Sequence, residues 1–172
     1  MMTLTAVLCC GMVMSSCSKS DDNGGTPAAP DTTPVSVKII YGAKVEADML
    51  ANADVEIEYL DASGNKQTEK MTATTWQKEV TAKLPAKAEA KMILKKKSGV
   101  DYANVGKIRI GGTVDYGYII LNKAGDVLSQ YGWSDTYSSQ DSSGPKFEMI
   151  IDKSGADYSH CSVEFDAQGK KK

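Results

Sequence analysis

The stretch VEIEY, residues 55 to 59, alternates apolar and charged side chains at every position. Successive side chains of a β-strand point to opposite faces of a sheet, so Val55, Ile57 and Tyr59 share one face and two glutamates share the other. The stretch VSVKI, residues 35 to 39, has the same period of two. Both segments predict strands with one face in a core and the other face in solvent.

Further segments continue this pattern towards the C-terminus. Residues 88 to 95 alternate except at Ile93, whose apolar side chain predicts partial burial on the second face of the sheet. The segments FEMII, residues 147 to 151, and CSVEF, residues 161 to 165, are also predicted strands. No segment carries the sustained apolar stripe of a helix, so the sequence predicts an all-β domain without helices.

Short segments of the form Asp/Asn-x-small-Gly separate these predicted strands, at residues 61 to 64, 122 to 125 and 152 to 155. The Asp or Asn side chain can accept hydrogen bonds from the backbone of its own turn. Glycine accepts the left-handed conformation that ends such a turn. We therefore expect three β-hairpins at these places and a fourth turn at residues 97 to 100.

Seven to nine short strands joined by tight turns are typical of an antiparallel β-sandwich. In this pattern the chain resembles an immunoglobulin-like or fibronectin-like module, although it lacks the cysteine pair of antibody domains. We expect a single sandwich domain over residues 35 to 167, followed by a basic tail at residues 168 to 172. A domain of this size can bury a sizeable apolar core.

The N-terminal segment predicts a signal peptide. Residues 1 to 16 carry no charge, and their apolar run is shorter than the roughly 20 residues that cross a bilayer as a helix. Met14, Ser15 and Ser16 precede Cys17, which is similar to the lipobox of bacterial lipoproteins, although Leu is usual where Met14 stands. The resemblance implies that Cys17 becomes the mature N-terminus and carries fatty-acyl chains such as palmitate, which hold the protein to a membrane.

The segment SKSDD, residues 18 to 22, resembles the acidic signal that follows the lipidated cysteine in surface-exposed lipoproteins of the Bacteroidota. This resemblance implies a lipid-anchored protein of the outer membrane, with the cell surface favoured and the periplasmic face as the alternative. Residues 23 to 34 are rich in Gly, Pro and Thr and show no hydrophobic period. Residues 17 to 34 are therefore expected to form a flexible tether.

Composition argues against several classes of function. With 20 basic and 22 acidic residues the formal net charge is −2, so a nucleic-acid partner is not expected. His160 is the only histidine, and on a strand it points away from the neighbouring Cys161, which disfavours a His-based catalytic relay. With Cys17 acylated, Cys161 is the only mature thiol and has no disulfide partner. Too few ligands are available for a zinc-type site, so no metal or cofactor is expected.

Aromatic residues gather in the segment YGWSDTY, residues 131 to 137, which follows YGY, residues 116 to 118. Rings beside Asp and Ser offer flat apolar area for a sugar ring or a peptide. The candidate ligand-binding residues are Tyr131, Trp133, Asp135 and Tyr137. In the alternative interpretation Trp133 or Tyr118 fills the sandwich core, a part that Trp76 can equally take.

These observations leave three hypotheses for the function. The first is a cell-surface binding module without catalysis, whose ligand is a glycan or a protein. The second is a structural accessory subunit of an outer-membrane assembly. The third is a hydrolase that uses carboxylates, because Glu56 and Glu58 are expected about 7 Å apart on one strand face, a separation within the range of glycoside chemistry.

Overall fold

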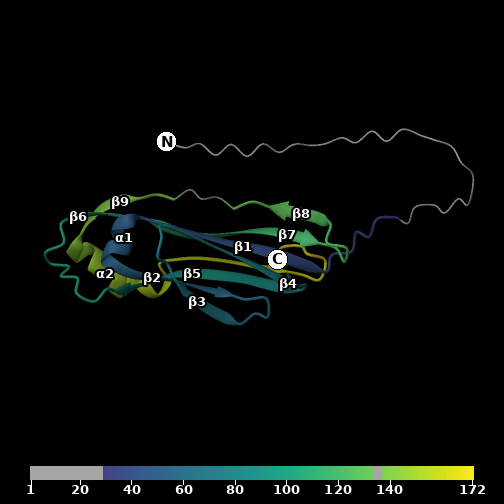
Figure 1. Ribbon diagram of the computed structural model, residues 1–172, viewed down its shortest axis with the longest axis horizontal. Coiled ribbons are helices and arrows are strands. Elements are labelled where there is room, and N and C mark those ends of the chain that lie inside the picture. The colour runs from purple at the N-terminus through teal and green to yellow at the C-terminus, as the bar shows by residue number, and fades with distance from the viewer. Residues whose placement is uncertain (1–28, 134–136) are drawn as a thin grey trace, which may run out of the picture. The chain divides into compact units, whose positions relative to one another are not determined.

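The computed structural model describes residues 29–133 and 137–172 (Figure 1). The chain divides into two units, residues 1–30 and 31–172, and the fold described below is that of the second unit. The predicted signal peptide, the lipidation site Cys17 and the tether up to residue 28 lie outside the described residues.

Eight strands of the described residues form two antiparallel four-stranded sheets that pack together. Sheet A has the order β4-β1-β7-β8 and consists of β1 (Ser36–Val45), β4 (Thr75–Lys83), β7 (Gly112–Leu121) and β8 (Val127–Tyr131). Sheet B has the order β10-β5-β2-β3 and consists of β2 (Ala53–Leu60), β3 (Lys66–Lys70), β5 (Ala86–Lys96) and β10 (Ser159–Phe165). The predicted antiparallel β-sandwich of seven to nine strands is confirmed.

Alternate side chains of these strands fill the space between the sheets. The predicted core residues of β2, namely Val55, Ile57 and Tyr59, are buried, and the residues between them are half-buried. Ile93 of β5 is half-buried, as predicted. The core continues through β1, β5, β7 and β10 with Val37, Ile39, Tyr41, Ala88, Ala90, Met92, Leu94, Val114, Ile120, Val163 and Phe165.

Helices and a third, two-stranded sheet gather at one end of the sandwich (Figure 1). The small sheet pairs β6 (Lys107–Ile110) with β9 (Gln140–Ser143), and it contacts α1 (Ala47–Asn52) and α2 (Gly144–Ser154). A short 3-10 helix, η1 (Gly155–Asp157), follows α2. The prediction of a domain without helices is therefore wrong at this end of the molecule.

The segment FEMII, predicted as a strand, lies within α2. Pro145 stands in the first helical turn, where its fixed φ and missing N–H are tolerated. Phe147 and Ile151 are one turn apart and both are buried, whereas Met149 is 48% exposed. The hairpin predicted at residues 152 to 155 is also wrong, because these residues end α2 and begin η1.

The other two predicted hairpins are confirmed. Between β2 and β3, Asp61 Oδ1 accepts hydrogen bonds from two backbone N–H groups at 2.9 and 3.0 Å, and Gly64 has φ of 78°. Between β7 and β8, Asn122 Oδ1 accepts from one backbone N–H at 2.8 Å, and Gly125 has φ of 90°. The predicted turn at residues 97 to 100 is confirmed as well, with a backbone hydrogen bond of 3.3 Å across it.

A further turn, with Asp at its first position and Gly at its fourth, follows β10 and was not predicted. Asp166 Oδ1 accepts hydrogen bonds from the N–H groups of Gln168 and Lys170, both at 2.9 Å, and Gly169 has φ of 72°. Lys171 then forms an isolated β-bridge with Phe165. The basic residues at the C-terminus are therefore folded against the domain.

Candidate functional site

Sheet A carries a glycine-lined strip on its outer face. The β1–β7 register pairs Ile40 with Gly117 and Gly42 with Asp115, so all four residues lie on the same side of the sheet. Tyr41 on β1 points into the core, which places Gly42 on the outer side. The two glycines leave a shallow depression across neighbouring strands.

The indole of Trp133 lies in this depression. A Cβ atom placed on Gly42 would come within 2.7 Å of the indole carbons, and one placed on Gly117 would lie 3.3 Å from Trp133 Cδ1. Only a glycine at position 42 therefore lets the ring rest against the strand. Trp133 is half-buried and lies outside the hydrophobic core, whereas Trp76 and Tyr118 pack against the core.

A shallow pocket of about 260 Å³ opens beside the indole. Its polar side chains are Lys44, Thr75 and Gln77, which come from β1 and β4. The pocket thus joins a flat apolar surface to hydrogen-bond donors and acceptors. This combination can stack on one face of a ring-shaped ligand and bind the polar groups at its edge.

Tyr137 contacts the residue that directly follows β1. Its hydroxyl donates a hydrogen bond of 3.3 Å to Glu46 Oε1, and Glu46 directly follows β1. Gly42 and Glu46 are four positions apart in extended backbone, a spacing of about 13 Å, so Trp133 lies against β1 and Tyr137 contacts the residue that follows it. Burial, together with the charge of Glu46, raises the pKa of Tyr137, so its phenol stays protonated. Asp135 lies outside the described residues.

Tyr131 belongs to a different group of rings. It stacks on Tyr118 with centroids 5.7 Å apart, and the Tyr116 ring lies 6.4 Å away. Lys171 Nζ lies 4.5 Å from the Tyr131 ring centroid, in cation–π contact. The structure therefore places Trp133 on the outer face of sheet A, Tyr137 against Glu46 just past the end of β1, and Tyr131 elsewhere, beside the C-terminal residues.

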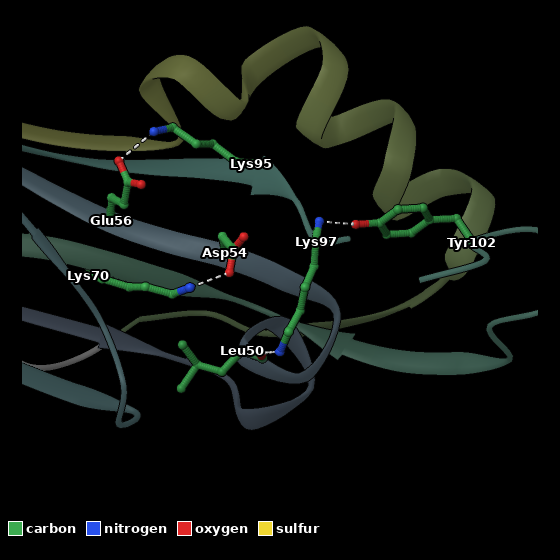
Figure 2. A network of polar contacts seen from close by, with 7 residues as sticks. All are labelled: Leu50, Asp54, Glu56, Lys70, Lys95, Lys97 and Tyr102. Carbon is green, nitrogen blue, oxygen red and sulfur yellow. Dashed lines mark hydrogen bonds and ion pairs between the residues drawn. The ribbon is translucent and has the colours of Figure 1, made fainter. Parts of the chain in front are cut away.

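The two glutamates considered for catalysis, Glu56 and Glu58, form ion pairs with lysines. Lys95 Nζ lies 2.7 Å from Glu56 Oε2, beside a second pair between Lys70 and Asp54 (Figure 2). Glu58 Oε1 is 3.0 Å from Lys66 Nζ, and this hydrogen bond is the main cause that lowers the pKa of Glu58. A catalytic general acid needs a raised pKa, so this environment favours a structural ion-pair network.

The only histidine, His160, and the thiol of Cys161 do not face each other. His160 is exposed, with Nδ1 3.3 Å from Asp157 Oδ1, while Cys161 is half-buried on the opposite face of β10. Burial raises the pKa of the Cys161 thiol to about 12, which keeps it in its unreactive protonated form.

The described residues contain neither a cluster of metal ligands nor a membrane-spanning helix. Within residues 29–133 and 137–172, no three His, Cys, Asp or Glu side chains are grouped so that they could hold a metal ion. In the same part of the chain, no helix has the length and apolar content to span a membrane. No protein-family model and no curated protein matches the chain.

Proposed function

We propose that this protein is a lipid-anchored, non-enzymatic β-sandwich that binds a glycan on the outer face of sheet A. The seat of the Trp133 indole on Gly42 is the observation that carries the proposal. Lys44, Thr75 and Gln77 complete the site, and Tyr137 lies beyond the end of β1, where it contacts Glu46.

The two glycines under the Trp133 indole favour a ring that is held in one orientation. Glycine in the interior of a strand weakens the strand, because it adds backbone entropy to the unfolded chain and offers no side chain to pack. Gly42 and Gly117 nevertheless occupy neighbouring strands of the same face, under one indole. Their cost is offset if the flat seat fixes the ring in one orientation, since a pre-ordered ring loses little entropy when a ligand stacks on it.

The chemistry of the pocket favours a sugar over a protein. A sugar ring has an apolar face of C–H groups that stacks on an aromatic ring, and hydroxyls at its edge that need polar partners. A protein-docking surface would instead present a large contiguous apolar patch. The pocket beside Trp133 is small, at about 260 Å³, and three of its side chains are polar.

The predicted lipid anchor would place this site at a membrane surface. Acyl chains on Cys17 and the tether after it would hold the sandwich at the outer membrane, with the cell surface as the favoured side. A glycan-binding module in that position meets polysaccharides outside the cell before they are degraded or taken up.

The proposal is tested by titrating the whole chain, in detergent, against a panel of neutral polysaccharides and then repeating the positive cases with Trp133→Ala. Loss of the stacking ring should weaken binding about tenfold or more. Tyr131→Ala is the matched control, because it removes an exposed aromatic ring from another part of the surface. No binding by the parent chain, together with unfolding of Trp133→Ala, would make Trp133 a packing residue and overturn the proposal.

A further inference from the structure

A second pocket, of about 400 Å³, lies where the C-terminal turn packs against the β7–β8 pair. It is separate from the Trp133 site, and the two share no lining residue. Six of its lining residues are one aromatic, two aliphatic, one hydroxyl-bearing and two basic residues: Tyr118, Ile120, Leu128, Ser129, Lys170 and Lys171.

The turn that carries the two lysines is held in place. The carboxylate of Asp166 accepts two backbone hydrogen bonds within the turn. Gly169 packs so closely on β7 that a Cβ atom there would lie 3.0 Å from Ile120 Cγ2. The N–H of Lys172 donates to the carbonyl of Glu164 at 3.0 Å, so the turn is fixed on both sides of the lysines.

The two lysines of this pocket differ in their surroundings from those of sheet B. Among the described residues, no carboxylate lies within ion-pair distance of Lys170 or Lys171, whereas Lys66 and Lys91 on sheet B both contact Glu58. The nearby Asp31 instead accepts a hydrogen bond from a backbone N–H at 2.9 Å. Lys171 Nζ faces tyrosine rings, 5.4 Å from the Tyr118 centroid, and a cation–π contact leaves it able to bind an anion as well.

We propose that this pocket binds a saccharide unit that carries a carboxylate or a phosphate. The sugar ring lies against Tyr118 and the apolar floor, Ser129 binds its hydroxyls, and the anionic group pairs with Lys170 and Lys171. These ion pairs discriminate acidic from neutral sugars, because an anionic group forms charge-assisted hydrogen bonds with lysine that a neutral sugar cannot form. This site acts independently of Trp133.

Three sugars of one ring type test the proposal: galacturonic acid, galactose 6-phosphate and galactose, each titrated calorimetrically into the whole chain. The acidic sugars should bind at least about fivefold more tightly than galactose, and added salt should reduce this difference. Comparison of the two acids tells whether a carboxylate or a phosphate is preferred. Equal binding of all three sugars, or no binding of either acid at about 10 mM, would overturn the proposal.

Variants then locate the binding site. Lys170→Gln combined with Lys171→Gln should abolish the preference for acidic sugars, while Lys146→Gln combined with Lys153→Gln, two exposed lysines of α2, should keep it. If the double variant unfolds, Lys170→Gln alone serves, because Lys170 contacts none of the tyrosine rings. Trp133→Ala should leave acidic-sugar binding unchanged, so this site and the Trp133 site fail or succeed separately. Equal loss in the α2 control would refute the assignment.

Discussion

The two sheets of the sandwich present different outer surfaces. The outer face of sheet B, the charged face, carries acids that are already paired: Glu58 contacts Lys66 and Lys91, and Glu56 contacts Lys95. The outer face of sheet A, the aromatic face, carries the glycine strip under Trp133. A ligand on the charged face must break ion pairs in order to bind, whereas the aromatic face offers the half-buried Trp133 ring with a pocket beside it. The difference indicates that a ligand-binding surface forms where glycines replace the bulkier side chains that strands usually carry.

The largest expected effect comes from filling the glycine strip. Gly42→Ala puts a methyl group within 2.7 Å of the indole, so it should displace Trp133, lower the free energy of unfolding by about 1 to 3 kcal/mol and weaken glycan binding. Gly106→Ala is the matched control, since nothing lies within 4 Å of its added Cβ. Urea denaturation measures both changes. If the two variants unfold at the same urea concentration, the indole is not seated on β1.

The second prediction concerns Glu69, at the edge of the sandwich where β3 of sheet B contacts β4 of sheet A. Glu69 on β3 accepts hydrogen bonds from Lys78 Nζ at 2.6 Å, Tyr59 Oη at 2.8 Å and Trp76 Nε1 at 3.0 Å, which joins sheet B to sheet A. These bonds, that from Lys78 first, hold the pKa of Glu69 at about 2, below its ordinary value of 4.5. The stabilisation is therefore complete above about pH 4.5 and is lost as the pH falls towards 2.

The measurement compares the parent chain with Glu69→Gln at several pH values. Because the Glu69 side chain is 38% exposed, solvent screening reduces its contribution to about 1 to 2 kcal/mol. The variant should be less stable by this amount near neutral pH and equal to the parent near pH 2. A stability difference that does not change with pH would show that the carboxylate charge is not what joins the sheets.

The smallest effect is expected on the charged face. Glu58→Gln removes the shared partner of Lys66 and Lys91, and partly exposed ion pairs of this kind contribute about 0.5 to 1 kcal/mol. Salt at about 1 M should remove most of the loss, because it shortens the screening length to about 3 Å. Thermal unfolding at low and high salt measures this. A cost greater than that of Gly42→Ala would reverse the order of the two faces.

Local signals in the sequence predicted the sandwich and two of its hairpins. Asp61 and Gly64 lie between segments of period two, so the turn and its flanking strands agree. The same turn form at residues 152 to 155 misled, because the apolar run FEMII fits a helix as well as a strand, and Pro145 before it was the signal for a helix start. The turn from Asp166 to Gly169 was not predicted, because Gln168 stands where that form has a small residue.

The candidate site was predictable only as an aromatic segment. The seat of Trp133 depends on Gly42 and Gly117, and the register that aligns them is a property of the β1–β7 pairing and not of either strand's sequence. Sequence pattern likewise grouped Tyr131 with Trp133, although β8 ends at Tyr131 and the next residues pass to the other side of the sheet. Pairing between strands that are distant in the sequence therefore determines where Trp133 and Tyr131 lie.

Strand β1 is hydrogen-bonded along its length to β4 on one side and to β7 on the other. The chain enters the sandwich at its start, where Val35 N–H donates to the Leu121 carbonyl and Asn122 Nδ2 donates to the Asp31 carbonyl. When a ligand is held at Trp133 and the chain is pulled from residue 31, the force runs parallel to β1. Hydrogen bonds perpendicular to a strand are then loaded together, in shear, and do not open one after another. A domain anchored through this end, as proposed, would therefore resist the drag of moving fluid on a bound glycan.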